Sequence, residues 1–476
     1  MLTTPRGGTA VHHDPVTTDR RDVLVVGGGS AGCVLAARLS EDPARTVLLL
    51  EPGALHVDDW PPELLDGGLI PAGHAETWQA TSALTPDRTG YLHRGRVVGG
   101  SGAVNGAYFV RATPADVDAW PGLGFDELLP SFDRSESDPL HGTHGPVPVA
   151  RSTVLHPLSA RFVVACRAAG FADEPDKNAG AGAGIGPLTR NARGGTRVNT
   201  ALAYLVPALG RPNLQVRAGA EVARVLVREG RATGVELIGG AHVHAEQVVL
   251  CAGAIGSAAI LLRSGIGPTE DLRALGLEVH ADLPVGAGFS DHPDVAVADV
   301  HAEQGARAPG TPALEVTLNT PTVELRPYTA GFDQLVPGSG AGPQPSVGVA
   351  LVVPDSRGTL RLRSTDPADA PAIAHHYLAS ARDRELLADG VRLAHELLGQ
   401  RPQAHVEAWV RENLGTSQHL VGTCALGTVV DAGFRVRGVD GLRVVDASVI
   451  PVVPSRGPHA TVVALAEHAA SRWSDP

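Results

Sequence analysis

Three glycines near the start of the chain have the spacing of a dinucleotide-binding turn. In the segment DVLVVGGGSAGCVLAARL, Gly27, Gly29 and Gly32 give the pattern G-x-G-x-x-G. In this pattern the first glycine permits a tight turn, the second lets the backbone approach a pyrophosphate, and the third lets a helix pack closely on a strand. Ser30 and Ala31 stand where the helix N-terminus would face the phosphate charge. The spacing therefore predicts a dinucleotide site.

The residues around these glycines predict the elements that must position them. Residues 22–26 form a short apolar run, apolar residues recur with roughly helical spacing over 33–39, and residues 46–50 form a second apolar run. Glu51 follows that run, where its carboxylate can accept both ribose hydroxyls of an adenosine. A lone glycine-rich turn binds nothing in many proteins, but this complete order of elements indicates a bound nucleotide.

A second glycine-rich segment favours FAD over NAD as that nucleotide. Residues 95–111, GRVVGGSGAVNGAYFVR, lie too far along the chain to belong to the first strand-helix-strand unit. Their glycines suggest a backbone lying against something flat and large, although a surface loop is the alternative for this segment taken alone. Two later segments weaken that alternative: residues 248–268 predict a strand, turn and helix, and residues 441–470 predict a strand, loop and helix.

These four ordered motifs resemble the glucose-methanol-choline (GMC) family of FAD-dependent oxidoreductases over nearly all of residues 22–470. The resemblance implies an α/β fold, with a Rossmann-like FAD-binding domain of GMC type interleaved with an α+β substrate domain built on an antiparallel sheet. We expect the FAD-binding domain to comprise residues 20–150, 195–290 and 419–476, and the substrate-binding domain to comprise residues 151–194 and 291–418. Alternating segments at 314–318, 345–353 and 359–362 predict antiparallel strands. Residues 1–19 are expected to form a disordered tail.

The resemblance places the chemistry in SQHLVGTCALG (417–427) and PSRGPHAT (454–461). It implies that His419 removes the hydroxyl proton of an alcohol while hydride passes to flavin N5, with His459 as a second catalytic residue. Histidine suits proton transfer near neutral pH. Pro458 suits a helix start, so His459, Ala460 and Thr461 would lie at a helix N-terminus that the resemblance turns toward the flavin. His292 is interpreted as an ordinary core or surface histidine.

Further cofactor contacts are implied by the resemblance, position by position. Val104 stands where some family members carry a histidine bonded covalently to the flavin, so noncovalent FAD is expected. The remaining contacts are Ser101, Asn105 and Gly106 to the flavin or its phosphates, the Val222 backbone to adenine, Asp446 and Ala447 to the phosphate and ribityl chain, and Ala460 and Thr461 at the helix start.

The short chain and the sequence of residues 88–120, RTGYLHRGRVVGGSGAVNGAYFVRATPADVDAW, also resemble the mycofactocin-associated GMC dehydrogenases of actinobacteria. This narrower likeness implies reduced mycofactocin as the substrate and onward electron transfer to a quinone, the respiratory chain or oxygen. Three alternatives stay open: an oxygen-using oxidase of small alcohols or a choline-dehydrogenase-like enzyme, a GMC-type lyase without net redox, and a noncatalytic FAD-binding protein. The paired histidines argue against the last of these.

Composition agrees with a large globular enzyme. The chain has 476 residues, 43% of them hydrophobic, and a net charge of -12, so its acidic balance argues against nucleic-acid binding. Its four cysteines have neither metal-ligand nor disulfide spacing. Arg20 and Arg21 precede an apolar stretch like an export signal, but removing that stretch would destroy the glycine motif. We expect a cytoplasmic enzyme without a transmembrane segment, and peripheral association with the inner face of the membrane stays open.

Overall fold

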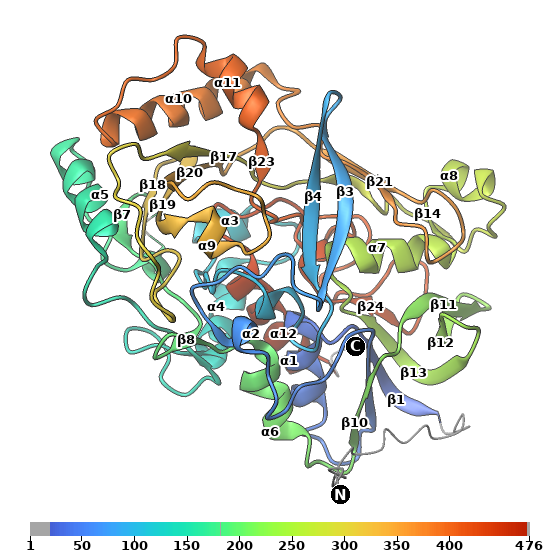
Figure 1. The fold of residues 1–476 in the computed structure, drawn as a ribbon. Coiled ribbons are helices and arrows are strands. Elements are labelled where there is room, and N and C mark those ends of the chain that lie inside the picture. The colour runs from blue at the N-terminus through green and yellow to red at the C-terminus, as the bar shows by residue number, and fades with distance from the viewer. Residues whose placement is uncertain (1–19, 181, 474–476) are drawn as a thin grey trace, which may run out of the picture.

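The structure, a computed structural model, describes residues 20–180 and 182–473 (Figure 1). The expected tail at residues 1–19 lies outside the described residues. The α/β architecture predicted from the sequence is confirmed: one sheet is mainly parallel, a second is mainly antiparallel, and their strands come from interleaved parts of the chain.

A seven-stranded sheet contains the glycine motif. In spatial order its strands are β10 (Leu214–Ala218), β2 (Val47–Glu51), β1 (Arg21–Val26), β13 (His242–Leu250), β12 (Arg231–Leu237) and β11 (Val222–Arg228), and β24 (Leu442–Val444) also pairs with β13. The strands from β10 to β13 and β24 are parallel, whereas β12 and β11 are antiparallel additions. β2 is buried along its whole length, as expected for a parallel strand covered on both faces.

The register of this sheet brings three chain segments to one edge. Val26 pairs with Leu50 on one side and with Leu250 on the other, so β1, β2 and β13 end at the same level. The residues that follow these strands therefore meet beyond their carboxyl ends, which is where open parallel sheets bind nucleotides.

A six-stranded sheet forms the second main layer. Its strands, in spatial order, are β23 (Gly415–Thr416), β17 (Pro293–Ala298), β20 (Pro345–Leu351), β19 (Val323–Gly331), β18 (Val316–Asn319) and β7 (Gly184–Pro187). All of its neighbouring pairs are antiparallel. β18 and β20 fall on two of the segments predicted to be antiparallel strands.

The third predicted segment joins a different sheet. This five-stranded sheet has the order β16 (Ala287–Phe289), β21 (Gly358–Arg361), β22 (Ala372–Ala374), β3 (Thr77–Thr85) and β4 (Arg88–Gly95). β3 and β4 form the long hairpin that projects upward in Figure 1. This sheet thus combines segments that lie far apart in the sequence.

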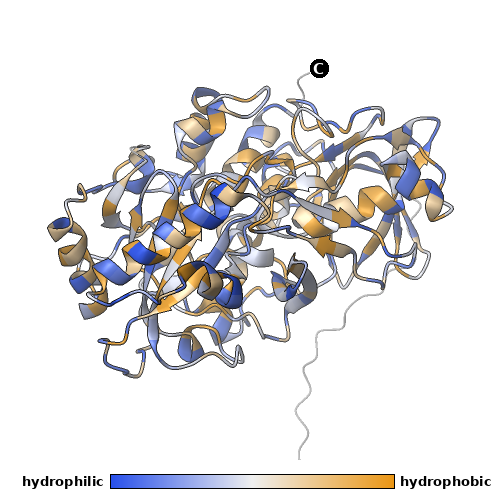
Figure 2. Ribbon diagram, turned by 90° about the horizontal axis from the view of Figure 1, so that it is seen from above, coloured by the Kyte–Doolittle hydropathy of each residue, from blue (hydrophilic) through white to orange (hydrophobic). Residues whose placement is uncertain are grey.

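The helices cover both main sheets. They are α1 (Ser30–Leu39), α2 (Pro62–Leu65), α3 (Pro114–Asp118), α4 (Phe125–Ser135), α5 (Pro157–Ala168), α6 (Val206–Ala208), α7 (Gly253–Arg263), α8 (Thr269–Ala274), α9 (Phe332–Leu335), α10 (Ala381–Leu397), α11 (Val406–Asn413) and α12 (His459–Ser471). Figure 2 shows hydrophobic residues concentrated on inner strands and helix faces, with hydrophilic residues on outer surfaces. No helix among the described residues is long and apolar enough to cross a membrane.

Helix α12 is tied to distant segments by one buried carboxylate. Glu467 accepts hydrogen bonds from Arg38 (Nη2, 2.8 Å), from Arg134 (Nε, 2.9 Å) and from the hydroxyl of Tyr204 (2.9 Å). Its side chain is 1% exposed, so removing one of these partners would leave a buried charge poorly satisfied. These bonds fix α12 against α1 and α4, and thereby fix the helix start at His459.

Candidate functional site

The two glycine-rich segments pack against each other beside the sheet. A Cβ atom built on Gly32 would lie 1.9 Å from the Gly27 carbonyl oxygen, and one built on Gly100 would lie 2.6 Å from Gly29 Cα. Gly27 has φ of +100°, a conformation that favours glycine. Steric demand therefore explains Gly27, Gly32 and Gly100 without any ligand.

Gly29 is different, because a Cβ built there meets no atom closer than 3.8 Å. The fold alone does not require glycine at this position, whereas close approach of a pyrophosphate would. Helix α1 starts next to it at Ser30 and Ala31 without a side-chain cap, so its first N–H groups are available to an anion. The residues at this edge therefore fit the pyrophosphate of FAD.

Glu51, predicted from the sequence to contact the adenosine, lies at the end of β2. Its side chain accepts hydrogen bonds from the backbone N–H of Gly28 at 2.8 Å and of Gly53 at 2.9 Å. Burial raises the pKa of this carboxyl to about 7, although the two N–H groups oppose the shift. Val222 begins β11 two residues after Ala220, whose N–H donates to the Glu51 carbonyl at 2.9 Å. The structure thus brings these two predicted contacts to one region.

Asp446 and Ala447 follow β24 at the same edge of the sheet. The Asp446 carboxylate accepts hydrogen bonds from Gly253 N–H at 2.9 Å, from the Ser257 hydroxyl at 2.5 Å and from Ser448 N–H at 2.8 Å. It therefore holds the start of α7 against the loop after β24. Ala447 begins a short 3-10 turn, Ala447–Val449.

We call the edge of the seven-stranded sheet beyond the carboxyl ends of β1, β2 and β13 the cofactor edge. The second glycine-rich segment connects this edge to His459. A Cβ built on Gly102 would lie 2.8 Å from His459 Nε2 and 2.9 Å from Ser30 Oγ, so both side chains converge on this glycine. Ser101 is exposed, and its hydroxyl accepts from Gly95 N–H at 3.3 Å. Val104 is buried, and Gly106 is partly buried.

Asn105 determines which nitrogen of His459 carries the proton. Asn105 Oδ1 accepts from Ala107 N–H at 2.9 Å, which turns its Nδ2 toward His459 Nδ1 at 3.1 Å. Because Nδ2 can only donate, Nδ1 is the acceptor and Nε2 carries the hydrogen of the neutral ring. Nε2 is buried and has no hydrogen-bond partner among the described residues. His459 therefore presents its Nε2–H beside Gly102 and near the Tyr108 backbone, where it can donate to a further acceptor.

Burial and a nearby guanidinium keep His459 neutral. Burial lowers its pKa to about 4, and the charge of Arg197 adds to the effect. Arg197 is fully buried and donates to the carbonyl groups of Leu64, Leu69, Ala103 and Asn105. Ala460 and Thr461 complete the uncapped first turn of α12, and the Thr461 hydroxyl accepts from Ala112 N–H at 3.2 Å.

His419 is paired with a second histidine that the sequence interpretation assigned no role. Nδ1 of His419 lies 3.0 Å from Nδ1 of His292, and the two rings meet at 81°. His292 is completely buried, and burial lowers its pKa to about 4. The pKa of His419 is also lowered, well below its ordinary value, by burial, the neighbouring ring and the Arg326 charge. Both rings are therefore neutral near pH 7.

The Asp291 carboxylate holds the backbone of this histidine pair. One of its carboxylate oxygens accepts from the backbone N–H groups of His292 and His419, each at 2.7 Å, and the other contacts His375 Nε2 at 3.2 Å and the Thr416 hydroxyl at 2.9 Å. Burial opposes its ionisation, but the His375 hydrogen bond and the nearby rings hold the pKa of Asp291 well below its usual range. Asp291 thus fixes the backbone of both site histidines.

The ring edges of Tyr108 and His419 border the same glycine. A Cβ built on Gly457 would lie 3.0 Å from the Tyr108 ring and 3.4 Å from His419 Cε1. Gly457 also lies two residues before His459 in the chain. The structure thus brings together His419, the segment that carries His459, and the side chains of His292, Asp291 and Tyr108. We call the region between them the histidine compartment.

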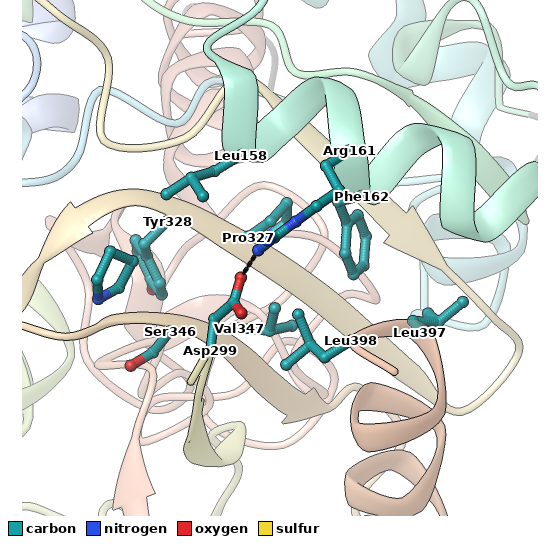
Figure 3. A pocket seen from close by; sticks show the side chains of 11 residues that line it. Leu158, Arg161, Phe162, Asp299, Pro327, Tyr328, Ser346, Val347, Leu397 and Leu398 are labelled. Atoms are coloured by element: carbon teal, nitrogen blue, oxygen red, sulfur yellow. Dashed lines mark hydrogen bonds and ion pairs between the residues drawn. The ribbon is translucent and has the colours of Figure 1, made fainter. Parts of the chain in front are cut away.

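A separate pocket lies between α5 and the six-stranded sheet (Figure 3). It is lined by Leu158, Phe162 and Tyr328, among others, and is crossed by the Arg161–Asp299 ion pair. Its cavity volume is about 20 Å³, which is room for about one water molecule. This pocket is therefore too small to hold an alcohol substrate.

Comparisons with known proteins point to one family. Models of the GMC oxidoreductase family match residues 21–294 and 354–466. The chain is 44% identical to a GMC-type oxidoreductase from the thcA 5' region of Rhodococcus erythropolis, over 95% of this chain and 98% of that protein. It is 32% identical to the mitochondrial choline dehydrogenase of Mus musculus, over 96% of this chain and 89% of that protein.

A solved structure agrees with this result. The crystal structure of pyridoxine 4-oxidase from Mesorbium loti superimposes with a TM-score of 0.87 at 31% identity, over 95% of this chain and 99% of that one.

Proposed function

Since the chain belongs to the GMC oxidoreductase family of FAD-dependent enzymes that act on CH–OH groups, we propose that it oxidises an alcohol with His419 as the general base. Bound FAD supplies the hydride acceptor. The observation that carries this assignment is the contact of His419 Nδ1 with His292 Nδ1 at 3.0 Å.

That contact constrains the protons of both rings. One Nδ1 must donate and the other must accept, because both rings are neutral. When His419 Nδ1 donates, its Nε2 keeps a free lone pair and can take the hydroxyl proton of an alcohol. His292 then carries its own proton on Nε2. The imidazolium formed on His419 would be stabilised by the buried Asp291 carboxylate beneath the pair.

His459 has a different role in this proposal. With its hydrogen on Nε2 it can donate to the substrate oxygen or to the flavin, which positions the hydroxyl group but cannot accept its proton. The uncapped N-terminus of α12 adds a favourable potential for negative charge developing nearby.

The finer parts of the proposal concern the cofactor, the domains and the substrate. FAD is bound noncovalently, because Val104 offers no side chain for attachment. The FAD-binding domain comprises residues 20–150, 195–290 and 419–476, and residues 151–194 and 291–418 bind substrate. The substrate is reduced mycofactocin, and electrons pass to a quinone, the respiratory chain or oxygen. Support for this substrate is the sequence of residues 88–120 and the short chain.

The decisive test is anaerobic reduction of the purified flavoprotein. We expect the flavin absorbance to bleach with at least one alcohol from a panel containing reduced mycofactocin, pyridoxine and choline. Cleavage of a cyanohydrin without bleaching would replace the oxidoreductase by a lyase. Binding of FAD with neither reaction would point to a noncatalytic protein. Acid precipitation of the same protein should release all of its FAD, and flavin left in the pellet would contradict noncovalent binding.

A further inference from the structure

Gln418, the residue before the proposed base His419, has a left-handed backbone. Its φ is +66°, in the region that favours glycine and that a long side chain rarely adopts. A rotation about this N–Cα bond turns every atom after it relative to every atom before it. The conformation of this one residue therefore sets where the His419 ring lies, and such strain persists only where other contacts hold it.

The side-chain amide of Gln418 makes those contacts at the free edge of β4. β4 is the last strand of its sheet, so its backbone groups that face away from β3 have no neighbouring strand. Gln418 Nε2 donates to the Tyr91 carbonyl at 2.9 Å, and its Oε1 accepts from His93 N–H at 3.0 Å. This is the pairing that one residue of a further parallel strand would make with β4. The amide thus takes the place of a strand beside the β3–β4 hairpin.

Arg94 strengthens this contact. Its Nη1 donates to Gln418 Oε1 at 2.8 Å and to the His93 carbonyl at 2.8 Å. A charged donor makes a stronger hydrogen bond than a neutral one. The backbone N–H of Gln418 donates to the Thr416 hydroxyl oxygen at 3.0 Å, and this hydroxyl donates to Asp291 at 2.9 Å. Both the amide and the backbone of Gln418 are therefore fixed.

Different segments hold the two sides of the loop that carries His419. On one side, Asp291 accepts from His419 N–H at 2.7 Å, and the His292 carbonyl accepts from Ser417 N–H at 3.0 Å. On the other side, the Gln418 amide joins the loop to β4. The contact between Nδ1 of His419 and Nδ1 of His292 is 3.0 Å long, and a hydrogen bond weakens steeply when its angle changes. A small rotation of this loop would therefore disturb the histidine pair.

We propose that Gln418 is a positioning residue for the alcohol oxidation: it ties the His419 loop to the β3–β4 hairpin and so fixes the His419 ring in the orientation that accepts the hydroxyl proton. Gln418 does not touch the reacting atoms, and it acts through His419. The inference rests on the proposed role of His419 as the base.

Two substitutions separate the amide contact from the backbone strain. Gln418→Asn keeps an amide and tolerates the left-handed backbone, but its side chain is one methylene group too short to reach β4 in the same way. Gln418→Gly adopts this backbone without strain and has no amide. Gln344→Asn is the matched control, because the Gln344 amide also makes two hydrogen bonds, to the carbonyl groups of Asp299 and Ala302. It lies near the end of β17 opposite to the end that pairs with β23.

The first readout needs no substrate. The Nδ1 hydrogen shared by His292 and His419 should give a proton magnetic resonance downfield of the amide region in the oxidised holoenzyme, and this resonance should be absent from His419→Ala. We expect it to shift or broaden in Gln418→Asn and Gln418→Gly and to keep its position in Gln344→Asn. A resonance identical to that of wild type in both Gln418 variants would overturn the proposal.

The second readout is stopped-flow reduction of the flavin by the panel alcohol that bleaches the wild-type holoenzyme fastest. In Gln418→Asn and Gln418→Gly the limiting rate should fall by at least ~10-fold, because misplacing a catalytic group slows the chemical step. The dissociation constant of the alcohol should stay within ~3-fold of wild type, since a general loss of structure would weaken binding as well. Full rates in both variants would overturn the proposal, and if one variant fails to fold with FAD the other decides.

A double variant tests whether Gln418 acts through His419. Gln418→Asn combined with His419→Ala should reduce the flavin no more slowly than His419→Ala alone, because the positioned ring is then missing. Losses that add in the double variant would overturn the proposal.

These outcomes separate the inference from the proposed function. His419→Ala at the wild-type rate would remove the base and, with it, the role of Gln418. A slow His419→Ala beside full rates in both Gln418 variants would leave alcohol oxidation standing and overturn the positioning alone. If no alcohol reduces the flavin, alcohol oxidation fails, and the resonance decides whether Gln418 positions the His419 ring.

Discussion

The cofactor edge and the histidine compartment are built in opposite ways. At the cofactor edge, glycines remove side chains so that two backbone segments and a helix start can approach each other, as Gly32 and Gly100 show. In the compartment, side chains do the positioning: Asp291 holds the backbone of His419, and the Tyr108 hydroxyl donates to Glu324. One region is therefore specified by short sequence patterns, and the other by pairs of residues far apart in the chain.

The largest expected effect comes from blocking the close backbone approach at Gly32. Gly32→Ala places a methyl group 1.9 Å from the Gly27 carbonyl oxygen, so we expect the free energy of unfolding to fall by about 4 kcal/mol or more. Gly210→Ala is the control, because a Cβ there meets nothing within 4 Å. Urea denaturation of both variants checks this, and a stable Gly32→Ala protein would contradict the steric argument.

Gly29→Ala tests the other kind of glycine in the motif, the one that the fold alone does not require. Its methyl group has room in the protein, so apoprotein stability should stay within about 0.5 kcal/mol of wild type. FAD affinity, measured by titration of the apoprotein, should nevertheless fall because the pyrophosphate loses its close approach. Equal affinity would mean that the pyrophosphate lies elsewhere.

The next effect tests burial in the histidine compartment through pH. The folded pKa of His292 is about 4, below the ordinary 6.5, so between these values the unfolded chain binds more protons. The free energy of unfolding therefore keeps its full value above pH 6.5. Through His292 it falls by about 3 kcal/mol as the pH drops toward 4. His292→Asn should remove that part of the pH dependence of unfolding. Equal curves for wild type and His292→Asn would refute the assignment.

The third effect compares the two histidines that face the compartment. His419→Ala should keep FAD but slow anaerobic flavin reduction by at least ~10² fold, the usual range for loss of a general base. His459→Asn keeps a hydrogen-bond donor at the start of α12 and should lose less than ~10-fold. Stopped-flow reduction rates decide between them, and the reverse order would exchange the two roles.

The smallest expected effect concerns Glu51, the side chain at the cofactor edge that we expect to contribute to FAD affinity. Glu51→Ala removes the proposed acceptor of the ribose hydroxyls, and we expect FAD affinity to fall by roughly 1.5 to 3 kcal/mol. Equilibrium titration of the apoprotein with FAD measures this loss. An affinity equal to that of wild type would show that the adenosine lies away from β2.

The sequence predicted the elements around the glycine motif well because their physical cause is local. The glycine spacing, the strands on either side and the start of α12 depend on neighbouring residues, and β1, α1 and β2 lie where they were expected. The fold class and family followed from the same motifs.

The charged compartment was missed because its causes are long-range. The alternation in residues 323–326, VELR, is typical of a strand with one polar face, but it does not say that this face is buried. His292 and Asp291 gave no local signal that separates them from other polar residues, since the His419 that both contact lies more than a hundred residues away in the chain. The charged alternation of 323–326 was the one available sign of Glu324 and Arg326.

The anchoring of α12 through Glu467 also orders events during biosynthesis. Arg38, Arg134 and Tyr204 leave the ribosome well before the carboxylate that joins them, and β24 arrives only shortly before it. A nascent chain that already carries the glycine turn still lacks His419 and His459. Flavin captured at that stage would be held without the two histidines of the proposed mechanism, so that mechanism requires that translation has passed α12.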